Sequence, residues 1–212
     1  MEASSIDATA WNKARIEALS DGVFAIAMTL LVLEIKVPGL DRRVAAPELW
    51  HEVLGRWPLF FSFVISFMLA SLFWFWHHVS LHCIRRIDGV IVAINLVFLM
   101  LVSMAPFSTA MLGSFTLHQP VSLAFYFGNQ LALGLTLNAH WMYAKWQGLI
   151  SDPDAPVVRR FSIAIRVQPI ACLATLVMIG INPRWCFNTF AIVQIPPVAF
   201  LRRRQRVEKG RA

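Results

Sequence analysis

Residues 14–38 read ARIEALSDGVFAIAMTLLVLEIKVP, and this stretch decides the class of fold. It is apolar from 23 to 33 except at Thr29, yet it begins with several polar side chains and closes with Glu34 and Lys36. A helix needs about 20 mostly apolar residues to cross the roughly 30 Å of a bilayer's hydrocarbon core. The stretch therefore predicts a membrane-spanning helix. Its polar beginning indicates that this helix lines something within the protein rather than facing lipid.

The rest of the chain has the same apolar character. Hydrophobic residues make up 58% of the 212 residues and charged residues only 15%, and the mean hydropathy of +0.61 argues against a soluble globular protein. We expect residues 1–212 to form a single all-α transmembrane domain with no separate soluble part. Six stretches are suited to span a membrane: 17–37, 58–76, 88–112, 121–144, 160–181 and 185–201. Between the first two spans, apolar residues in 39–57 predict a short interfacial helix.

The positive charges predict the orientation of these spans. With an even number of spans both termini lie on one side, and most of the 19 lysines and arginines lie in segments on that side. Because basic residues that flank spans stay cytoplasmic, both termini are expected inside the cell. The net charge of +7 and the tail 201–212, LRRRQRVEKGRA, are interpreted as an orientation anchor that attracts anionic lipid. No nucleic-acid partner is expected.

One face of the first span combines small, aliphatic and hydroxyl side chains. At 3.6 residues per turn, five residues share this face: Gly22, Ile26, Thr29, Leu30 and Leu33. Any apolar helix yields such a stripe, so its periodicity leaves open whether it lines a pore or packs against another helix. A pore along it would be narrow and apolar, with one hydroxyl layer at Thr29.

Polar residues gather at the expected inner end of the spans. A carboxylate inside a span is costly unless it is paired or hydrated, so Asp21 is a functional-site hypothesis. Ser20 and Asp21 point more than about 100° away from Ile26, toward neighbouring helices. The candidate partners of Asp21 are Arg15, His77, His78, Asn95 and Arg166. Such a polar network would lock the first helix against the second and third, and whether it also takes part in transport stays open.

The remaining residues do not predict a metal site or a catalytic centre. His78 and His82 have the i, i+4 spacing that can bind zinc, but no local carboxylate completes a site. The three cysteines are widely spaced, which suits packing. Motifs such as His-Glu-x-x-His are absent from the sequence, so we expect no cofactor and no enzymatic activity.

Residues 15–22, RIEALSDG, resemble the R-x-x-x-F-S-D signature of the transmembrane protein 175 family of lysosomal and bacterial potassium channels. Leu19 stands where the family usually has phenylalanine. The resemblance covers the first three spans, and the last three match in hydropathy only. It extends over GVFAIAMTLLVLEI (22–35), FWFWHH (73–78), the span that contains Asn95, and APFSTAML (105–112).

The resemblance implies a homotetramer with the first helix of each subunit around a central potassium path. Ile26, Leu30 and Leu33 would then form a hydrophobic gate, and Thr29 would supply the hydroxyl layer tied to potassium preference. No TVGYG segment occurs, so selectivity must rest on a different filter. Near the outer end of the first helix, Glu34 could either concentrate cations at the pore mouth or pair with Lys36 or Arg56.

The predicted function is therefore a potassium-preferring channel in a prokaryotic plasma membrane, with potassium as the permeant ion. A secondary transporter is the alternative, and a membrane-embedded enzyme is a weaker one. A transporter would be expected to show inverted repeats or acidic groups near the middle of its spans. No internal repeat is detectable, and the middles of spans two to six contain no Asp, Glu or Lys.

Overall fold

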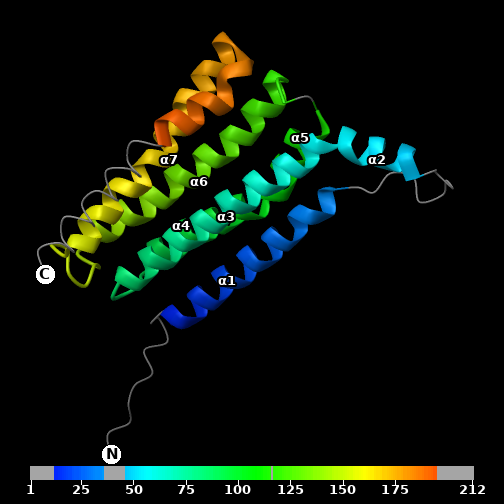
Figure 1. The fold of residues 1–212 in the computed structure, drawn as a ribbon. Helices are drawn as coiled ribbons and strands as arrows, with labels where there is room; N and C mark the ends of the chain where they lie inside the picture. Colours follow the sequence, from blue (N-terminus) through cyan, green and yellow to red (C-terminus); the bar gives the residue numbers. More distant parts are fainter. Residues whose placement is uncertain (1–11, 36–45, 116, 195–212) are drawn as a thin grey trace, which may run out of the picture.

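The computed structural model of the chain describes residues 12–35, 46–115 and 117–194 (Figure 1). Within these ranges the secondary structure is helical apart from an isolated bridge between Ile84 and Ile150, which confirms the all-helical prediction for the part described. A helical segment at 186–194 follows the last named element. The elements are α1 (Lys13–Leu30), η1 (Leu31–Glu34), α2 (Ala46–Gly55), α3 (Trp57–Cys83), α4 (Gly89–Ser103), α5 (Ala105–Ser114), α6 (Pro120–Trp146), α7 (Pro156–Ile181) and η2 (Pro183–Trp185).

Among the described residues, four helical stretches are long and apolar enough to cross a membrane: Lys13–Glu34, Trp57–Cys83, Gly89–Ser114 and Pro156–Ile181. They correspond to the first, second, third and fifth predicted spans. The fourth predicted span, 121–144, falls in α6, which is as long as α3 but is not among the four. Several polar residues lower its hydropathy, including Asn129, Gln130, Asn138 and His140. The sixth predicted span, 185–201, lies within the described residues only as far as residue 194.

Two helices extend beyond the predicted spans. The first helix begins at Lys13 rather than at 17, because the side chain of Asn12 caps it by accepting a hydrogen bond of 3.0 Å from the amide of Ala14. α3 continues beyond the predicted span 58–76 to Cys83, with no glycine or proline after residue 76 to interrupt it. His77 therefore lies inside a helix rather than after one.

The third predicted span consists of two helices. The predicted stretch 88–112 is interrupted at Met104, between α4 and α5. Pro106 has no backbone N–H to donate to the carbonyl of Val102, and its ring would clash with that carbonyl in a continuous helix, so the hydrogen bonding of α4 cannot pass through it. The side chain of Asp88 caps the start of α4 by accepting a hydrogen bond of 2.9 Å from the amide of Ile91.

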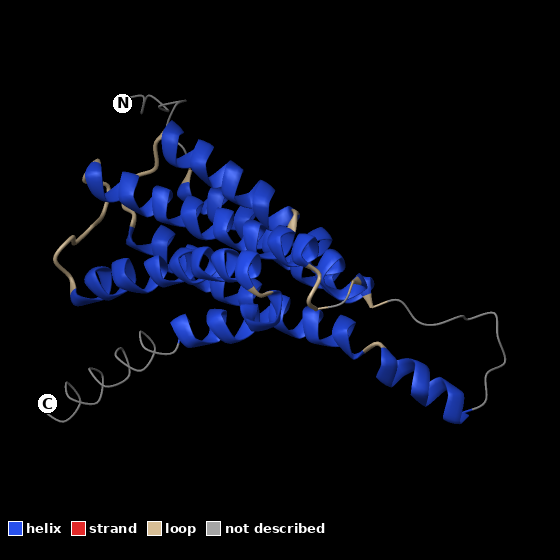
Figure 2. Cartoon of the chain, turned by 90° about the horizontal axis from the view of Figure 1, so that it is seen from above, coloured by secondary structure: helices blue, strands red, loops and turns tan. Residues whose placement is uncertain are grey.

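The helices form a bundle with α1 at one edge. α1 packs on α3 and α4, whereas α6 and α7 pack together on the other side (Figure 1). A Cβ atom at Gly134 of α6 would lie only 3.1 Å from Cδ of Pro169, so the glycine allows α6 and α7 to approach closely. Figure 2 shows α2 projecting beyond the bundle. This is the short helix predicted within 39–57, and Leu49, Trp50 and Leu54 on it are exposed.

Hydrogen bonds to backbone carbonyls show which connections share an end of the bundle. Nζ of Lys13, at the start of α1, donates a hydrogen bond of 2.8 Å to the carbonyl of Ile84, just after α3. The amide of Arg85 donates one of 2.8 Å to the carbonyl of Leu149, between α6 and α7. The start of α1, the α3–α4 turn and the α6–α7 turn therefore lie together.

Candidate functional site

The helix α1 has one face buried against its own chain. Phe24 packs between α3 and α4, with ring centroids 5.9 Å from Phe98 and 6.1 Å from His77. The buried residues recur with the period of a helix and continue into η1: Ile16, Ser20, Phe24, Ala27 and Leu31. This face fixes how α1 is rotated in the bundle.

The opposite face of α1 is not covered by the chain. Ile26 is 62% exposed and Leu33 is 67% exposed, and Leu30 and Thr29 are also exposed. All the residues of the stripe predicted from the sequence, Gly22 included, therefore point away from the helices of their own chain. In a membrane-spanning helix, such a face contacts lipid, another subunit or a pore.

Thr29 interrupts this exposed face with a hydroxyl group of defined orientation. Its Oγ1 lies 2.9 Å from the carbonyl oxygen of Ala25 and 2.8 Å from that of Ile26, so its hydrogen is donated back to the helix. A hydroxyl has one donor and two acceptor lone pairs. Since the donor is used within the helix, lone pairs of Thr29 Oγ1 remain to accept a hydrogen bond or to face a cation.

Part of the predicted polar network exists and is buried. Nε2 of His77 lies 2.7 Å from Oδ1 of Asn95, and Nδ2 of Asn95 donates a hydrogen bond of 3.3 Å to Oγ of Ser20. Oγ of Ser20 in turn donates one of 2.8 Å to the carbonyl of Ile16. These contacts link α1, α3 and α4. Removing one partner would leave a buried polar group unsatisfied, so the chain of bonds holds the three helices in one register.

Asp21 has a different partner from those predicted. Its Oδ1 accepts a hydrogen bond of 2.8 Å from Nε1 of Trp74 on α3. His78 stacks on Trp74, with ring centroids 5.8 Å apart. The predicted contact between His78 and the Asp21 carboxylate is therefore replaced by the bond from Trp74. Arg15 is exposed and lies outside the buried network. Asp21 sits one residue after Ser20, so the rotation of α1 that buries Ser20 turns Asp21 toward the outer edge of α3.

Sequence reasoning missed Trp74 and Phe98. The ring of Phe98 stacks on His77 with centroids 5.1 Å apart and planes within 6° of parallel, which fixes the imidazole against α4. Trp74 could have been identified, because an indole N–H within a span needs an acceptor. It also lies one helical turn before His78, one of the predicted partners of Asp21.

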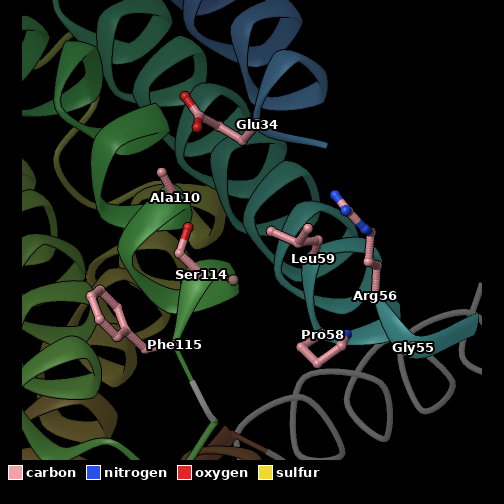
Figure 3. A pocket seen from close by; sticks show the side chains of 9 residues that line it. Glu34, Gly55, Arg56, Pro58, Leu59, Ala110, Ser114 and Phe115 are labelled. Atoms are coloured by element: carbon pink, nitrogen blue, oxygen red, sulfur yellow. The ribbon is translucent and has the colours of Figure 1, made fainter. Parts of the chain in front are cut away.

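Glu34 lies at the far end of α1 from this network. It lines a cavity of about 560 Å³ between η1, the start of α3 and the end of α5 (Figure 3). In the described part of the chain Glu34 forms no ion pair with Arg56, one of its predicted partners, and Lys36 lies outside the described residues. Within the same ranges, no three His, Cys, Asp or Glu side chains gather in an arrangement that could hold a metal.

Known proteins are similar to this chain both in sequence and in fold. Residues 15–106 match the family model described as endosomal/lysosomal potassium channel TMEM175. The matched residues run from α1 to the beginning of α5. A potassium channel of Streptomyces collinus is 38% identical over 165 residues, which cover 74% of this chain and 79% of that protein. A potassium channel of Chamaesiphon minutus is 41% identical over 132 residues, covering 61% of this chain and 64% of that protein.

A solved structure extends the similarity to nearly the whole bundle. The crystal structure of a lysosomal potassium-selective channel TMEM175 homologue from Chamaesiphon minutus superimposes with a TM-score of 0.75 and 32% identity, covering 88% of this chain and 96% of that chain. The fold and these similarities define a multi-pass, all-helical ion-channel protein rather than an enzyme. The chain belongs to the TMEM175 family of potassium channels.

Proposed function

We propose that the chain assembles as a homotetramer in which four copies of α1 surround a path for potassium. The observation on which this proposal depends is that α1 has two unlike faces. One face is buried by the chain itself, and the other presents Ile26, Thr29, Leu30 and Leu33 with no cover. Four such faces around an axis would form a bore with one hydroxyl layer between rings of aliphatic side chains.

The aliphatic rings would form the gate. Ile26 and Leu30 are branched and offer an ion no polar partner, so a narrow bore between them holds neither water nor a dehydrated ion. A small outward shift or rotation of α1 would widen the bore and wet it. Phe24 packs α1 against α3 and α4. Because packed interfaces shift between discrete arrangements, α1 would move between two defined positions on these helices.

Thr29 would provide the selectivity layer. Because its hydrogen is donated within the helix, its oxygen can face a passing cation, and four subunits would supply four such oxygens. One ring of hydroxyls replaces less of an ion's hydration shell than a stack of carbonyl rings does. We therefore expect a modest preference for potassium over sodium.

The same proposal includes six membrane crossings with both termini in the cytoplasm, in a prokaryotic plasma membrane. The shared end of α1, the α3–α4 turn and the α6–α7 turn supports alternating crossings, with α6 as the fourth. In this arrangement the polar residues of α6 are covered by the chain, since Gln130, Asn138 and His140 are buried. The segment that begins at 186–194 would be the sixth crossing.

Reconstituted protein tests this proposal in two measurements. A channel collapses a potassium gradient across liposomes passively, whereas the alternative, a coupled transporter, requires a second gradient. Native mass spectrometry or light scattering of the purified protein should give four chains per particle. A monomer that conducts, or flux that depends on a second ion gradient, would contradict the tetrameric pore.

A further inference from the structure

The cavity beside Glu34 is lined by both charged and apolar side chains. Three separate elements contribute to it: η1 provides Glu34, the α2–α3 connection provides Arg56, and the end of α5 provides Ser114 and Phe115 (Figure 3). Its volume of about 560 Å³ lies within the roughly 300–1,000 Å³ of typical small-molecule pockets.

The cavity lies just beyond a close contact between α3 and α5, where α3 begins and α5 ends. A Cβ atom at Gly113 would lie 2.6 Å from Oγ of Ser62 and 2.7 Å from Cδ2 of Leu59, so any larger residue would force these neighbours to shift. α5 ends at Ser114 and α3 begins at Trp57, immediately beyond the contact. The helix ends therefore surround an open space.

Opposite charges stand at the walls of this space. The carboxylate of Glu34 is partly buried and, in the part of the chain that the structure describes, has no ion-pair partner. The Arg56 guanidinium makes a contact of its own, but its five N–H donors allow it to bind an anion as well. The hydroxyl of Ser114 supplies a further polar group, while Pro58, Leu59 and Phe115 supply apolar walls.

The location of the cavity indicates the source of its ligand. It lies at the end of the bundle where exposed Trp57 opens α3, and where α2 with its exposed Trp50 projects. Tryptophans of this kind gather at the level of lipid headgroups. A molecule that enters there can place a charged group in the cavity and leave its acyl chains beside the bundle.

We propose that this cavity binds the headgroup of a zwitterionic phospholipid with a primary amine, phosphatidylethanolamine. Its phosphate pairs with Arg56, since guanidinium binds phosphate through charge-assisted hydrogen bonds. Its ammonium donates to the carboxylate of Glu34, with the Ser114 hydroxyl beside it. Phosphatidylcholine carries the same phosphate and charge but no N–H donor on nitrogen, so Glu34 distinguishes the two lipids.

The test measures lipid binding by the delipidated full-length protein, by native mass spectrometry with titrated phosphatidylethanolamine or phosphatidylcholine. Because the readout is binding rather than flux, its failure is distinct from failure of the proposed pore. The wild-type protein is expected to bind phosphatidylethanolamine about tenfold more tightly than phosphatidylcholine, as one charge-assisted hydrogen bond would give. Glu34→Gln should abolish this preference, and Arg56→Gln should weaken the binding of both lipids.

Two controls make the result decisive. Glu52→Gln changes an exposed carboxylate on nearby α2 that does not line the cavity, and it should leave the preference intact. Soluble phosphoethanolamine should compete weakly, because it lacks acyl chains. Equal binding of both lipids to the wild-type protein, an unchanged preference in Glu34→Gln, or soluble phosphoethanolamine binding as tightly as the lipid would each overturn the proposal.

Discussion

The indole nitrogen of Trp74 donates a hydrogen bond of 2.8 Å to the carboxylate of Asp21, and this contact joins α3 to α1 beside the buried Ser20–Asn95–His77 network. The bond lies where the polar beginning of α1 enters the bundle. It satisfies the only carboxylate within α1 that lies beyond its first two turns. The same helix presents its aliphatic stripe one to three turns further on. Substitutions can therefore separate residues that hold α1 from residues that line a path.

Trp74→Phe should destabilise the protein by about 1 kcal/mol. The change keeps an aromatic ring but removes the N–H donor to a charged acceptor, and partial exposure of both side chains keeps the loss near the lower end of the range for such bonds. Thermal unfolding in detergent measures the effect. Trp146→Phe, at the exposed end of α6, is the matched control and should have no effect. An equal loss in both variants would mean that the bond contributes nothing specific.

Asn95→Leu should cost more, about 1–3 kcal/mol, because it leaves His77 and Ser20 without their partner in a buried setting. Asn129→Leu serves as the comparison, since Asn129 makes one longer bond of 3.4 Å to Ser108 and is only partly buried. Denaturant unfolding of the reconstituted protein should rank Asn95→Leu as the less stable variant. The reverse ranking would show that the buried network does not fasten α1.

Thr29→Val should reduce the preference for potassium over sodium while leaving measurable current. Valine keeps the shape of threonine but removes the oxygen that, in the proposed pore, would face a passing ion. Thr29→Ser is the control, because serine retains the hydroxyl and its bond back to the helix carbonyl. The measurement is the reversal potential with potassium on one side and sodium on the other. If Thr29→Val leaves that potential unchanged, Thr29 is not part of the filter.

Ile26→Asn should raise basal potassium flux from liposomes, since an amide at the proposed constriction would hold water there and remove the hydrophobic barrier. Ile170→Asn is a matched control on α7, where Ile170 is 59% exposed against 62% for Ile26. Both variants need the same protein density in the vesicles. Only the substitution on α1 should change flux. Wild-type flux in both would identify the exposed face of α1 as a packing surface.

Gly113→Ala should destabilise the bundle by about 1–3 kcal/mol, because the new methyl group overlaps Ser62 and Leu59 and forces α3 and α5 apart. Gly128→Ala on α6 meets no atom within 4 Å and should be neutral or slightly stabilising, as alanine favours helix over glycine. The melting temperature of Gly113→Ala should therefore fall below that of the wild-type protein, while that of Gly128→Ala should stay equal to it or rise slightly. Equal values would contradict the close α3–α5 contact.

The amino-acid sequence by itself determined the all-helical membrane class, the family and the approximate positions of the helices. Long apolar stretches report a property of each segment alone, since a segment of that length and hydropathy has no favourable place but a bilayer. The short helix before α3 was also predictable, as was the polar cluster near the start of α1. These features depend on residues close together in the chain.

Only the tertiary structure decided which face of α1 is covered and which partner each polar side chain takes. Nearly every residue of 23–33 is apolar, so this part of the helix carries no contrast between a packing face and a free face. The rotation of α1 depends on Phe24 fitting between α3 and α4, whose residues lie far away in the chain. That rotation directs Asp21 to Trp74 and Ser20 to Asn95, and the break of the third span at Met104 sets where α5 ends beside Glu34. Such choices depend on the packing of several helices at once, which no single segment contains.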